Sequence, residues 1–180
     1  MIILNLNILN KMIHGVSKEA TRYWLQGIHI FDREGLRYYE STDGHILFRA
    51  TAPIKGDALP ADYIIKMQSA IKSKCPECEL VLADKETAVI KSDTKNAFDI
   101  IDGNFPPVDN IIIKNGEPAK EYAIFAPDLL EKLVKFHGEK KFICNRPIMN
   151  DCKSPAQWEW EDESNQIKYI AIIMPMMLND

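Results

Sequence analysis

The strongest constraint on the fold is a pattern that occurs three times, an amphipathic helical segment followed by a block of short extended segments. The repeat period is about 60 residues. Helices are expected within residues 7–16, 59–74 and 126–138, where apolar side chains recur at the i, i+3, i+4, i+7 spacing of one helix face. Their apolar positions are Leu9, Met12, Ile13 and Val16, then Ile64, Met67 and Ile71, then Leu130, Leu133, Val134 and His137. Pro60 and Pro127 are typical helix starts, and Gly138 is a typical helix end.

Each helical segment precedes segments that favour strands. Alternation of apolar and polar residues is clearest at Trp158-Glu159-Trp160, and an Asp43-Gly44 pair predicts a hairpin turn with positive φ at both residues. The extended segments are 22–31, 35–41 and 45–54, then 78–85, 87–93 and 96–105, then 140–146, 156–162 and 167–177. The sequence therefore predicts an α+β protein with antiparallel sheets.

The repeat also predicts the domain organisation. Residues 1–56 and 57–116 are two units of one domain, and residues 117–180 are a third unit. One helix and three or four strands cannot close a core alone, because the sheet has a face to cover and edges to pair. Two units make a natural domain and three leave one unpaired, so we expect the chain to complete itself with another subunit.

The chemistry-bearing side chains do not form a recognisable catalytic or metal pattern. Cys75 and Cys78 have a C-x-x-C spacing, but Cys144 and Cys152 are too far apart for the second half of a standard zinc site. The four histidines lack the serine or cysteine partner of a triad, and no glycine-rich phosphate-binding motif is present. We therefore expect reduced thiols, no metal, no cofactor and no enzymatic activity.

Net charge and hydropathy restrict the cellular location and the partners that the protein can have. The formal net charge is −4, which argues against a surface that grips nucleic acid over its whole area but allows a locally basic face. No apolar run approaches the roughly 18 residues of a membrane span, and the apolar start carries neither a basic leader nor a cleavage site. We expect a cytoplasmic protein that does not enter a membrane.

Four motifs resemble, in order along the chain, the bacterial DNA polymerase III beta sliding clamp family. The motifs are TRYWLQGIHI with LRYYESTDGHILF, IIDGNFPPVDNII, FAPDLLEKLVKF and YIAIIMPMML. The resemblance implies an equivalent of the family's middle domain over about residues 1–116, followed by one half of its last domain. The family's first domain and the other half of the last domain have no counterpart.

This resemblance implies a ring in which helices line a central hole and sheets form the rim. Such a ring encloses duplex DNA without reading its sequence and acts as a DNA polymerase processivity factor, so the resemblance implies a protein associated with the nucleoid. The lysines expected to face DNA are Lys11, Lys66, Lys72, Lys74, Lys132 and Lys135. The alternative interpretation of each is a solubilising surface lysine.

The resemblance also implies a cleft that binds short linear peptides of a polymerase and a clamp loader. The matching positions are Arg22 and Leu25 in the first strand; Thr42, Gly44, His45 and Leu47 around the turn; Pro106 and Ile111; and Ile172, Met174, Pro175 and Met176. Methionine and branched aliphatic residues suit an adaptable pocket. Ile46, Asn110 and Met177 stand where the family usually has basic residues, so the cleft is expected to be more apolar.

The repeat count suggests the assembly. A ring of known clamps contains about twelve such units, so three units per chain predict a homotetramer. The reduced size suggests a phage or mobile element as the source. Two alternatives are a clamp-derived decoy that sequesters partners without encircling DNA, and a metal-dependent enzyme that uses the cysteines and histidines.

Overall fold

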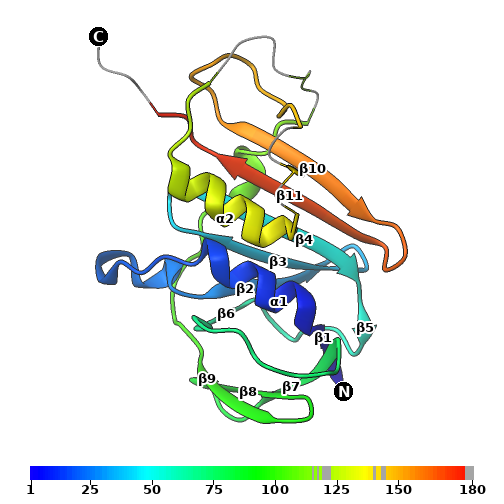
Figure 1. Cartoon of the computed structure of the whole chain (residues 1–180). Helices are drawn as coiled ribbons and strands as arrows, with labels where there is room; N and C mark the ends of the chain where they lie inside the picture. Colours follow the sequence, from blue (N-terminus) through cyan, green and yellow to red (C-terminus); the bar gives the residue numbers. More distant parts are fainter. Residues whose placement is uncertain (115, 117, 119–122, 140, 143–144, 177–180) are drawn as a thin grey trace.

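Two antiparallel sheets and two α-helices form the described part of the chain (Figure 1). In this computed structural model, residues 1–114, 116, 118, 123–139, 141–142 and 145–176 are described. The helices are α1 (Leu6–Met12) and α2 (Pro127–His137), with 3-10 turns η1 (Ile13–Gly15), η2 (Ala20–Leu25) and η3 (Val108–Asn110). The strands are β1 (Ile2–Asn5), β2 (Ile28–Arg33), β3 (Leu36–Thr42), β4 (Ile46–Pro53), β5 (Lys55–Gly56), β6 (Tyr63–Ile65), β7 (Glu77–Leu82), β8 (Thr87–Lys91), β9 (Lys95–Asp99), β10 (Ala156–Asp162) and β11 (Ile167–Ile173). These elements confirm the predicted α+β class.

The two segments predicted as the first two units, residues 1–56 and 57–116, exchange their first strands. The smaller sheet has the order β5-β1-β7-β8-β9, so β1 of the first unit pairs with β7 of the second. The larger sheet has the order β10-β11-β4-β3-β2-β6, so β6 of the second unit pairs with β2 of the first. The smaller sheet therefore contains β1 and β5 from the first unit, and the larger sheet contains β6 from the second.

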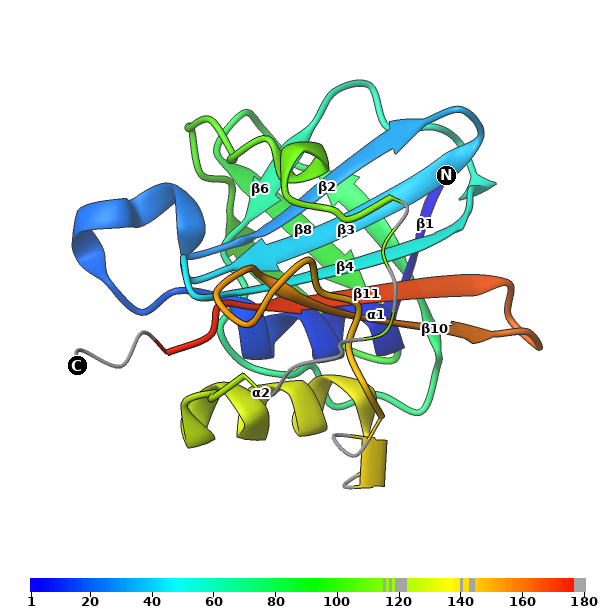
Figure 2. The same ribbon diagram turned by 90° about the horizontal axis from the view of Figure 1, so that it is seen from above.

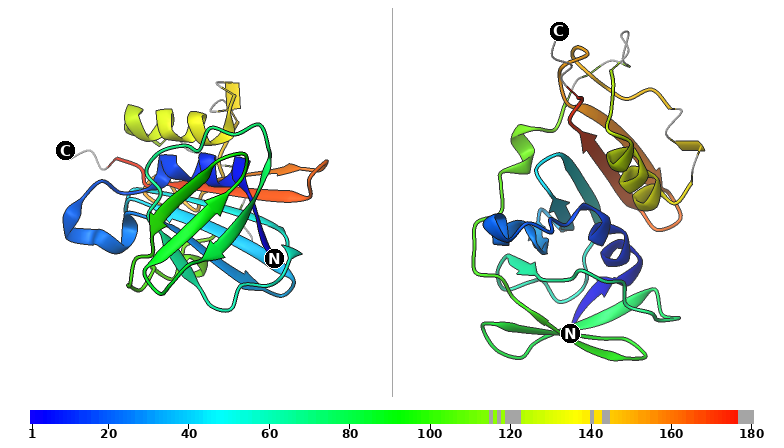
Figure 3. Two further views of the ribbon diagram at one scale, coloured as in Figure 1. Left: turned by 90° about the horizontal axis from the view of Figure 1, so that it is seen from below. Right: turned by 60° about the vertical axis from the view of Figure 1, so that its left-hand side comes forward.

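The third unit extends the larger sheet. Strand β11 runs antiparallel to β4, from Lys168 opposite Thr51 to Ile173 opposite Ile46. In Figure 3, the hairpin of β10 and β11 lies at the end of the molecule opposite the smaller sheet. Within the sheet, the third predicted unit therefore pairs with the first unit and not with the second unit that precedes it in sequence.

The main core lies between the two helices and the inner face of the larger sheet (Figure 2). It continues onto the smaller sheet through Leu80, Ala88 and Ile90. Helices α1 and α2 lie side by side on this face, and the rings of Phe48 in β4 and Phe136 in α2 stack with their centroids 4.0 Å apart. Alternate strand residues such as Tyr39 and Tyr169 point into the same core. The opposite, outer face carries the intervening residues, because successive strand side chains alternate between the two faces.

The predicted second helix is absent, which corrects the expectation for residues 59–74. Residues 63–65 form β6, and the following residues to 76 are described without helical structure. Ile65 lies opposite Ile28 at the edge of the larger sheet, and the coil that follows is tied to α1 by Asn10, whose side chain bonds both the N–H and the C=O of Ile71. Pairing and packing therefore override the apolar spacing that favoured a helix.

The first and third helices are confirmed, but the buried face of the third differs from the prediction. Leu129, Leu133 and Phe136 are buried, whereas Leu130, Val134 and His137 are half-buried. Helix α2 begins at Pro127, and its carboxyl end is capped by Gly138 in the left-handed conformation, at φ 102°. The segment 140–146, expected as a strand, lies partly outside the described residues.

Candidate partner-binding and DNA-facing surfaces

The β3–β4 turn is a three-residue connection centred on Gly44. Gly44 alone has positive φ, at 95°, so the expectation of positive φ at Asp43 is wrong. Asp43 instead accepts hydrogen bonds from the N–H groups of His45, at 2.8 Å, and Ile46, at 3.0 Å. The Thr42 hydroxyl accepts from the N–H of Gly44, at 3.1 Å, and donates to the C=O of Ile46, at 2.7 Å. The carboxylate and the hydroxyl together fix the turn.

Asp43 also links the turn to α2 through Lys132. Burial alone would raise the pKa of Asp43, but the hydrogen bonds from Lys132 and the two backbone N–H groups hold it below its usual range. The ion pair joins the third unit to the first, because Lys132 and Asp43 belong to different units.

Arg22 and Leu25 lie in the 3-10 turn η2, not in a strand, which corrects their predicted placement. Leu25 is buried, with 3% of its surface exposed, and its carbonyl accepts from the N–H of Ser17 at 2.9 Å. Arg22 is exposed, and a methyl group at Gly44 would come within 2.7 Å of its Nη1 atom. The close approach of Arg22 to the turn therefore depends on the glycine.

The end of β11 meets the turn from the other side. The N–H of Met174 donates to the C=O of His45 at 3.0 Å, and the N–H of Met176 donates to the C=O of Ile124 at 2.7 Å. Met174 and Met176 are exposed at 42% and 47%, while Pro175 between them is buried. Met174 is thus exposed beside the turn, and Met176 is exposed beside Ile124. Met177 lies outside the described residues.

The deeper predicted pocket residues are already covered by the chain itself. Leu47 and Ile172 are opposite each other in the β4–β11 pairing, and both are buried on the outer face of the sheet under Val108. Phe105 and Ile112 pack against the same cluster. We call residues 103–113, which run over this outer face, the crossing segment.

Ionic contacts anchor the crossing segment. Asp109 accepts from Arg49 in β4 at 2.6 Å and from Arg33 in β2 at 2.8 Å, and these hydrogen bonds lower its pKa to about 2. Arg49 also pairs with Glu40 in β3, which in turn contacts Nδ1 of His29 at 3.0 Å. Glu40 and Arg49 are 2% and 6% exposed, so this part of the network is buried.

The two ends of the crossing segment are also fixed. Near its start, the Phe105 ring stacks on the His29 ring with a centroid distance of 4.8 Å. At its end, the backbone of Ile113 bonds the side-chain amide of Gln157 in β10, at 2.8 Å and 3.0 Å. Pro106 is half-buried in this segment, whereas Ile111 is 40% exposed.

Sequence reasoning missed Val108 and Phe105, which fill the pocket, and Tyr23, which is 50% exposed beside Arg22. An exposed tyrosine has no sequence signal of its own. The Asp-Gly pair at 102–103 belongs to one of the family-like motifs, but nothing in the sequence indicated that the following residues cover Leu47.

The six predicted DNA-facing lysines have different environments. Lys11 is half-buried: its Nζ donates to the C=O of His137 at 3.1 Å and lies 4.9 Å from the centre of the Tyr169 ring. Burial lowers the pKa of Lys11, with an opposing effect from Asp162. The structure therefore places Lys11 in the contact between α1 and α2, rather than on an open surface.

Of the other five, Lys132 pairs with Asp43, Lys135 with Glu131 at 2.7 Å, and Lys66 lies 3.9 Å from Asp99. Lys72 and Lys74 are exposed on the coil beside α1, and no ion pair of either is found within the described residues. These two are the most available cations of the predicted set.

A cavity of about 450 Å³ lies where α2 meets η1 and the turn. Its basic lining residues are Lys132 and Lys135, which were predicted to face DNA, His45, which was predicted to bind peptides, and His14 and Lys18, which were not predicted. Burial lowers the pKa of His14, and the nearby Lys135 lowers it further. The walls also include Glu19 and Asp43, so the positive charge is only partly neutralised.

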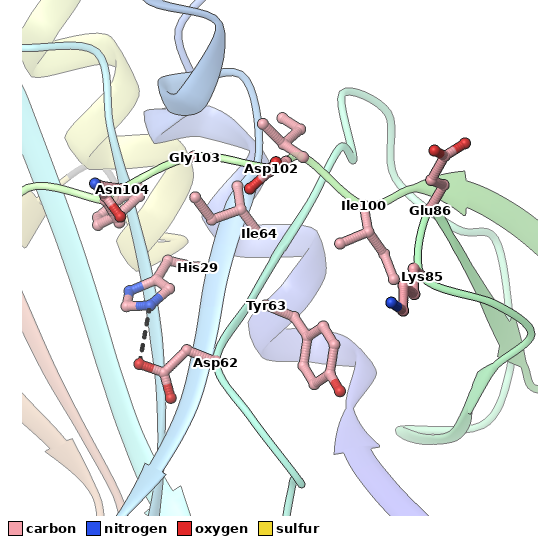
Figure 4. A pocket seen from close by; sticks show the side chains of 12 residues that line it. His29, Asp62, Tyr63, Ile64, Lys85, Glu86, Ile100, Asp102, Gly103 and Asn104 are labelled. Carbon is pink, nitrogen blue, oxygen red and sulfur yellow. Dashed lines mark ion pairs between the residues drawn. The ribbon is translucent and has the colours of Figure 1, made fainter.

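A second, larger cavity of about 680 Å³ lies between the edge strand β6 and the start of the crossing segment (Figure 4). His29 faces it, 3.9 Å from Asp62, and Lys85, Glu86 and Asp102 also line it. None of the predicted peptide-binding residues lines this cavity.

No group of three or more histidine, cysteine or acidic side chains within the described residues could hold a metal ion. Cys75 is exposed and Cys78 is buried, and burial raises the pKa of the Cys78 thiol to about 12. Cys144 lies outside the described residues. No helix in the described part of the chain is long and apolar enough to cross a membrane.

Helices on one face of the larger antiparallel sheet, with strands exchanged between the first two predicted units, define an α+β architecture. Comparison with protein-family models and with curated protein sequences gives no match. Comparison with solved structures does find matches, and they show that the chain has the fold of bacterial DNA polymerase III beta chains, as the sequence resemblance predicted.

Three of these structures illustrate the likeness. The DNA polymerase III beta chain of Streptococcus pneumoniae has a TM-score of 0.70 at 12% identity, with 98% of this chain and 64% of that chain covered. The beta subunit of Pseudomonas aeruginosa gives 0.72 at 14% identity, with 98% and 66% covered. The beta subunit of Thermotoga maritima gives 0.68 at 15% identity, with 99% and 66% covered. The chain therefore spans about two thirds of the length of the clamps it matches.

Proposed function

We propose that this protein is a sliding clamp, a non-enzymatic processivity factor that encircles duplex DNA in the cytoplasm and tethers a polymerase. The observation that carries the proposal is the likeness to solved sliding clamps over 98% of the chain, at TM-scores up to 0.72. In the proposed ring, α1, α2 and the coil that carries Lys72 and Lys74 face the hole. Attraction to phosphates is then sequence-independent and weak, which agrees with a net charge of −4.

The proposed ring is a homotetramer in which units 1–56, 57–116 and 117–180 of each chain contribute to the wall. Light scattering in solution tests this assembly. The expected mass is four times the 20.6 kDa of one chain, and a monomer or dimer would refute the tetramer.

The proposed docking surface for partner peptides is the rim formed by Arg22, His45, Met174 and Met176, and we add Ile111, which is 40% exposed. Its support is the contact of Arg22 with the turn, the hydrogen bond from Met174 to His45, and the exposure of both methionines. Leu47, Ile172 and Leu25 form the buried support beneath this rim, and Thr42 and Gly44 shape the turn.

Topological retention on DNA is the decisive experiment. The protein is incubated with nicked circular DNA, with and without a bacterial clamp loader, and passed through a gel-filtration column. We expect it to co-elute with circles and to dissociate when the circle is linearised, because a ring slides off free ends. Equal retention on linear and circular DNA would contradict encirclement.

A clamp-derived decoy is the second candidate. The state of the predicted DNA-facing lysines favours it, because Lys11 is half-buried and Lys66, Lys132 and Lys135 lie beside carboxylates of the chain itself. A decoy would bind clamp-partner peptides and inhibit extension of a primed circular template, with no retention on circles.

A further inference from the structure

The cavity beside α2 lies across the contact between the third predicted unit and the first. Its volume of about 450 Å³ falls within the roughly 300–1,000 Å³ of sites that hold small molecules. Lys132 and Lys135 line it from α2, and Lys18 lines it from the segment that follows η1. Because α2 packs against η1 and lies beside α1 (Figure 2), a ligand in this cavity touches both units.

Helix α2 presents two lysines on one face of the cavity. Lys132 and Lys135 are three residues apart, and positions with this spacing are neighbours on a helix surface. Lys135 pairs with Glu131 at 2.7 Å, but both side chains are at least half exposed, so this pair is weak. Glu131 does not line the cavity. The ammonium group of Lys135 can therefore leave Glu131 for a ligand in the cavity at little cost.

The segment that carries Lys18 is held in place by the buried Ser17. The Ser17 hydroxyl accepts a hydrogen bond from the N–H of Glu19 at 3.1 Å, and the N–H of Ser17 donates to the C=O of Leu25 at 2.9 Å. Lys18 itself is exposed, and no ion pair of this lysine is found in the part of the chain that the structure describes. Lys18 is thus a positioned cation that is available to a ligand.

Two carboxylates line the cavity and do not cancel its positive charge. Asp43 is already bound by Lys132 and by the N–H groups of His45 and Ile46. Glu19 is exposed, and it has no ion pair among the described residues. Three lysines and two carboxylates leave one positive charge before either histidine of the lining is protonated.

His14 is half-buried in the same lining, and its surroundings disfavour the imidazolium. Burial lowers the pKa of His14, and Lys135 lowers it further. The charged and titratable groups that line the cavity with it are Lys132 and Lys135 of α2, Lys18 and Glu19 after η1, and Asp43 and His45 of the turn; the coil contributes the uncharged Gln68. An anion in the cavity would offset the cations and favour a proton on His14.

We infer that this cavity binds one phosphate group between Lys18, Lys132 and Lys135, with a proton taken up from solvent by His14. Lysine binds phosphate as a point charge, whereas a planar carboxylate ligand is held better by the fork of an arginine. No arginine is among the described residues that line the cavity. The phosphate group belongs either to a free phosphate compound or to the backbone of DNA, and the site does not depend on the proposed ring.

Isothermal titration calorimetry with inorganic phosphate, at constant ionic strength in chloride, tests the site. K135M should weaken phosphate binding about tenfold, because one of three cationic partners is lost. The matched control K85M removes a lysine from the cavity beside β6 and should leave the affinity unchanged. No binding by the unmodified chain, or an equal loss in both variants, would overturn the site.

A titration with sulfate tests the proton on His14, because sulfate remains a dianion in neutral and mildly acidic solution. The affinity of the unmodified chain for sulfate should rise about tenfold when the pH falls from about 8 to about 6. H14Q should bind sulfate like the unmodified chain at the higher pH and should lose this rise, with folding checked by circular dichroism. A rise that persists in H14Q, or no rise in the unmodified chain, would overturn the proton uptake.

A short duplex oligonucleotide, added to the phosphate complex, identifies the source of the phosphate group. Displacement of phosphate would support a backbone phosphate of DNA as the ligand, and retention of phosphate would support a free phosphate compound. These titrations use neither circular DNA nor a clamp loader. Failed retention on circles would therefore refute the proposed clamp and leave the phosphate site standing.

Discussion

The variant R49L tests the buried network beneath the crossing segment. Arg49 is 6% exposed and bonds both Glu40, which is 2% exposed, and Asp109. Removing the guanidinium leaves the Glu40 carboxylate buried with only His29 as an ionic neighbour among the described residues. Breaking a buried pair in this way costs about 3–5 kcal/mol, so the free energy of unfolding should fall by that amount.

Urea unfolding followed by tryptophan fluorescence measures this change. The matched control D109N removes the half-exposed partner of Arg49, whose ion pairs are screened by solvent, and should cost about 1 kcal/mol or less. In the double variant E40M/R49L no charge is left unpaired, so stability should recover relative to R49L. A loss below about 1 kcal/mol for R49L would refute the view that Glu40 depends on this pair.

Three further predictions concern the core, acid stability and DNA contact. F136A should cost about 3–5 kcal/mol in urea unfolding, because it removes a fully buried ring that stacks on Phe48; a cost near zero would contradict the packing of α2 on the sheet. The pKa of Asp109 is lowered from 3.8 to about 2 in the folded state, so its stabilising contribution is present above pH 3.8 and is lost as pH falls toward 2; D109N should remove this part of the acid transition in pH titrations. K72E/K74E should weaken DNA retention and reduce its salt dependence, because two cations proposed to face phosphates are reversed in charge. The control is K85E, which reverses the charge of a lysine in the cavity beside β6. Equal effects of both variants would exclude a specific role of the coil that carries Lys72 and Lys74.

The fold could be predicted largely from local pattern. The helices at α1 and α2 followed from apolar spacing, and α2 also from Pro127 and Gly138. The missing second helix could not be predicted, because Ile64, Met67 and Ile71 are buried in an extended chain as well as they would be in a helix. The extended conformation of β6 is determined by its pairing with the edge of β2, and such long-range pairing cannot be detected from the local spacing of apolar residues.

The candidate site was predicted only in part. The turn at Gly44 followed from its dipeptide, and the positions around it followed from the family resemblance. The burial of Leu47 under the crossing segment could not be predicted. It depends on the ion pair between Asp109 and Arg49, which are far apart in sequence and whose complementary charges are common on any protein surface. The half-burial of Lys11 was likewise hidden, since it requires α2 to pack beside α1.

The strand exchange between the first two units has a consequence for how the molecule comes apart. The smaller sheet needs β1 from the first unit as well as β7, β8 and β9 from the second, and the larger sheet needs β6 from the second unit beside β2 of the first. Neither sheet is therefore complete until both units have folded. Fragments cut between the units would each retain a sheet with an unpaired edge. The two units are therefore expected to unfold in one cooperative step, and their amide protons to exchange with solvent at the same rate-limiting opening.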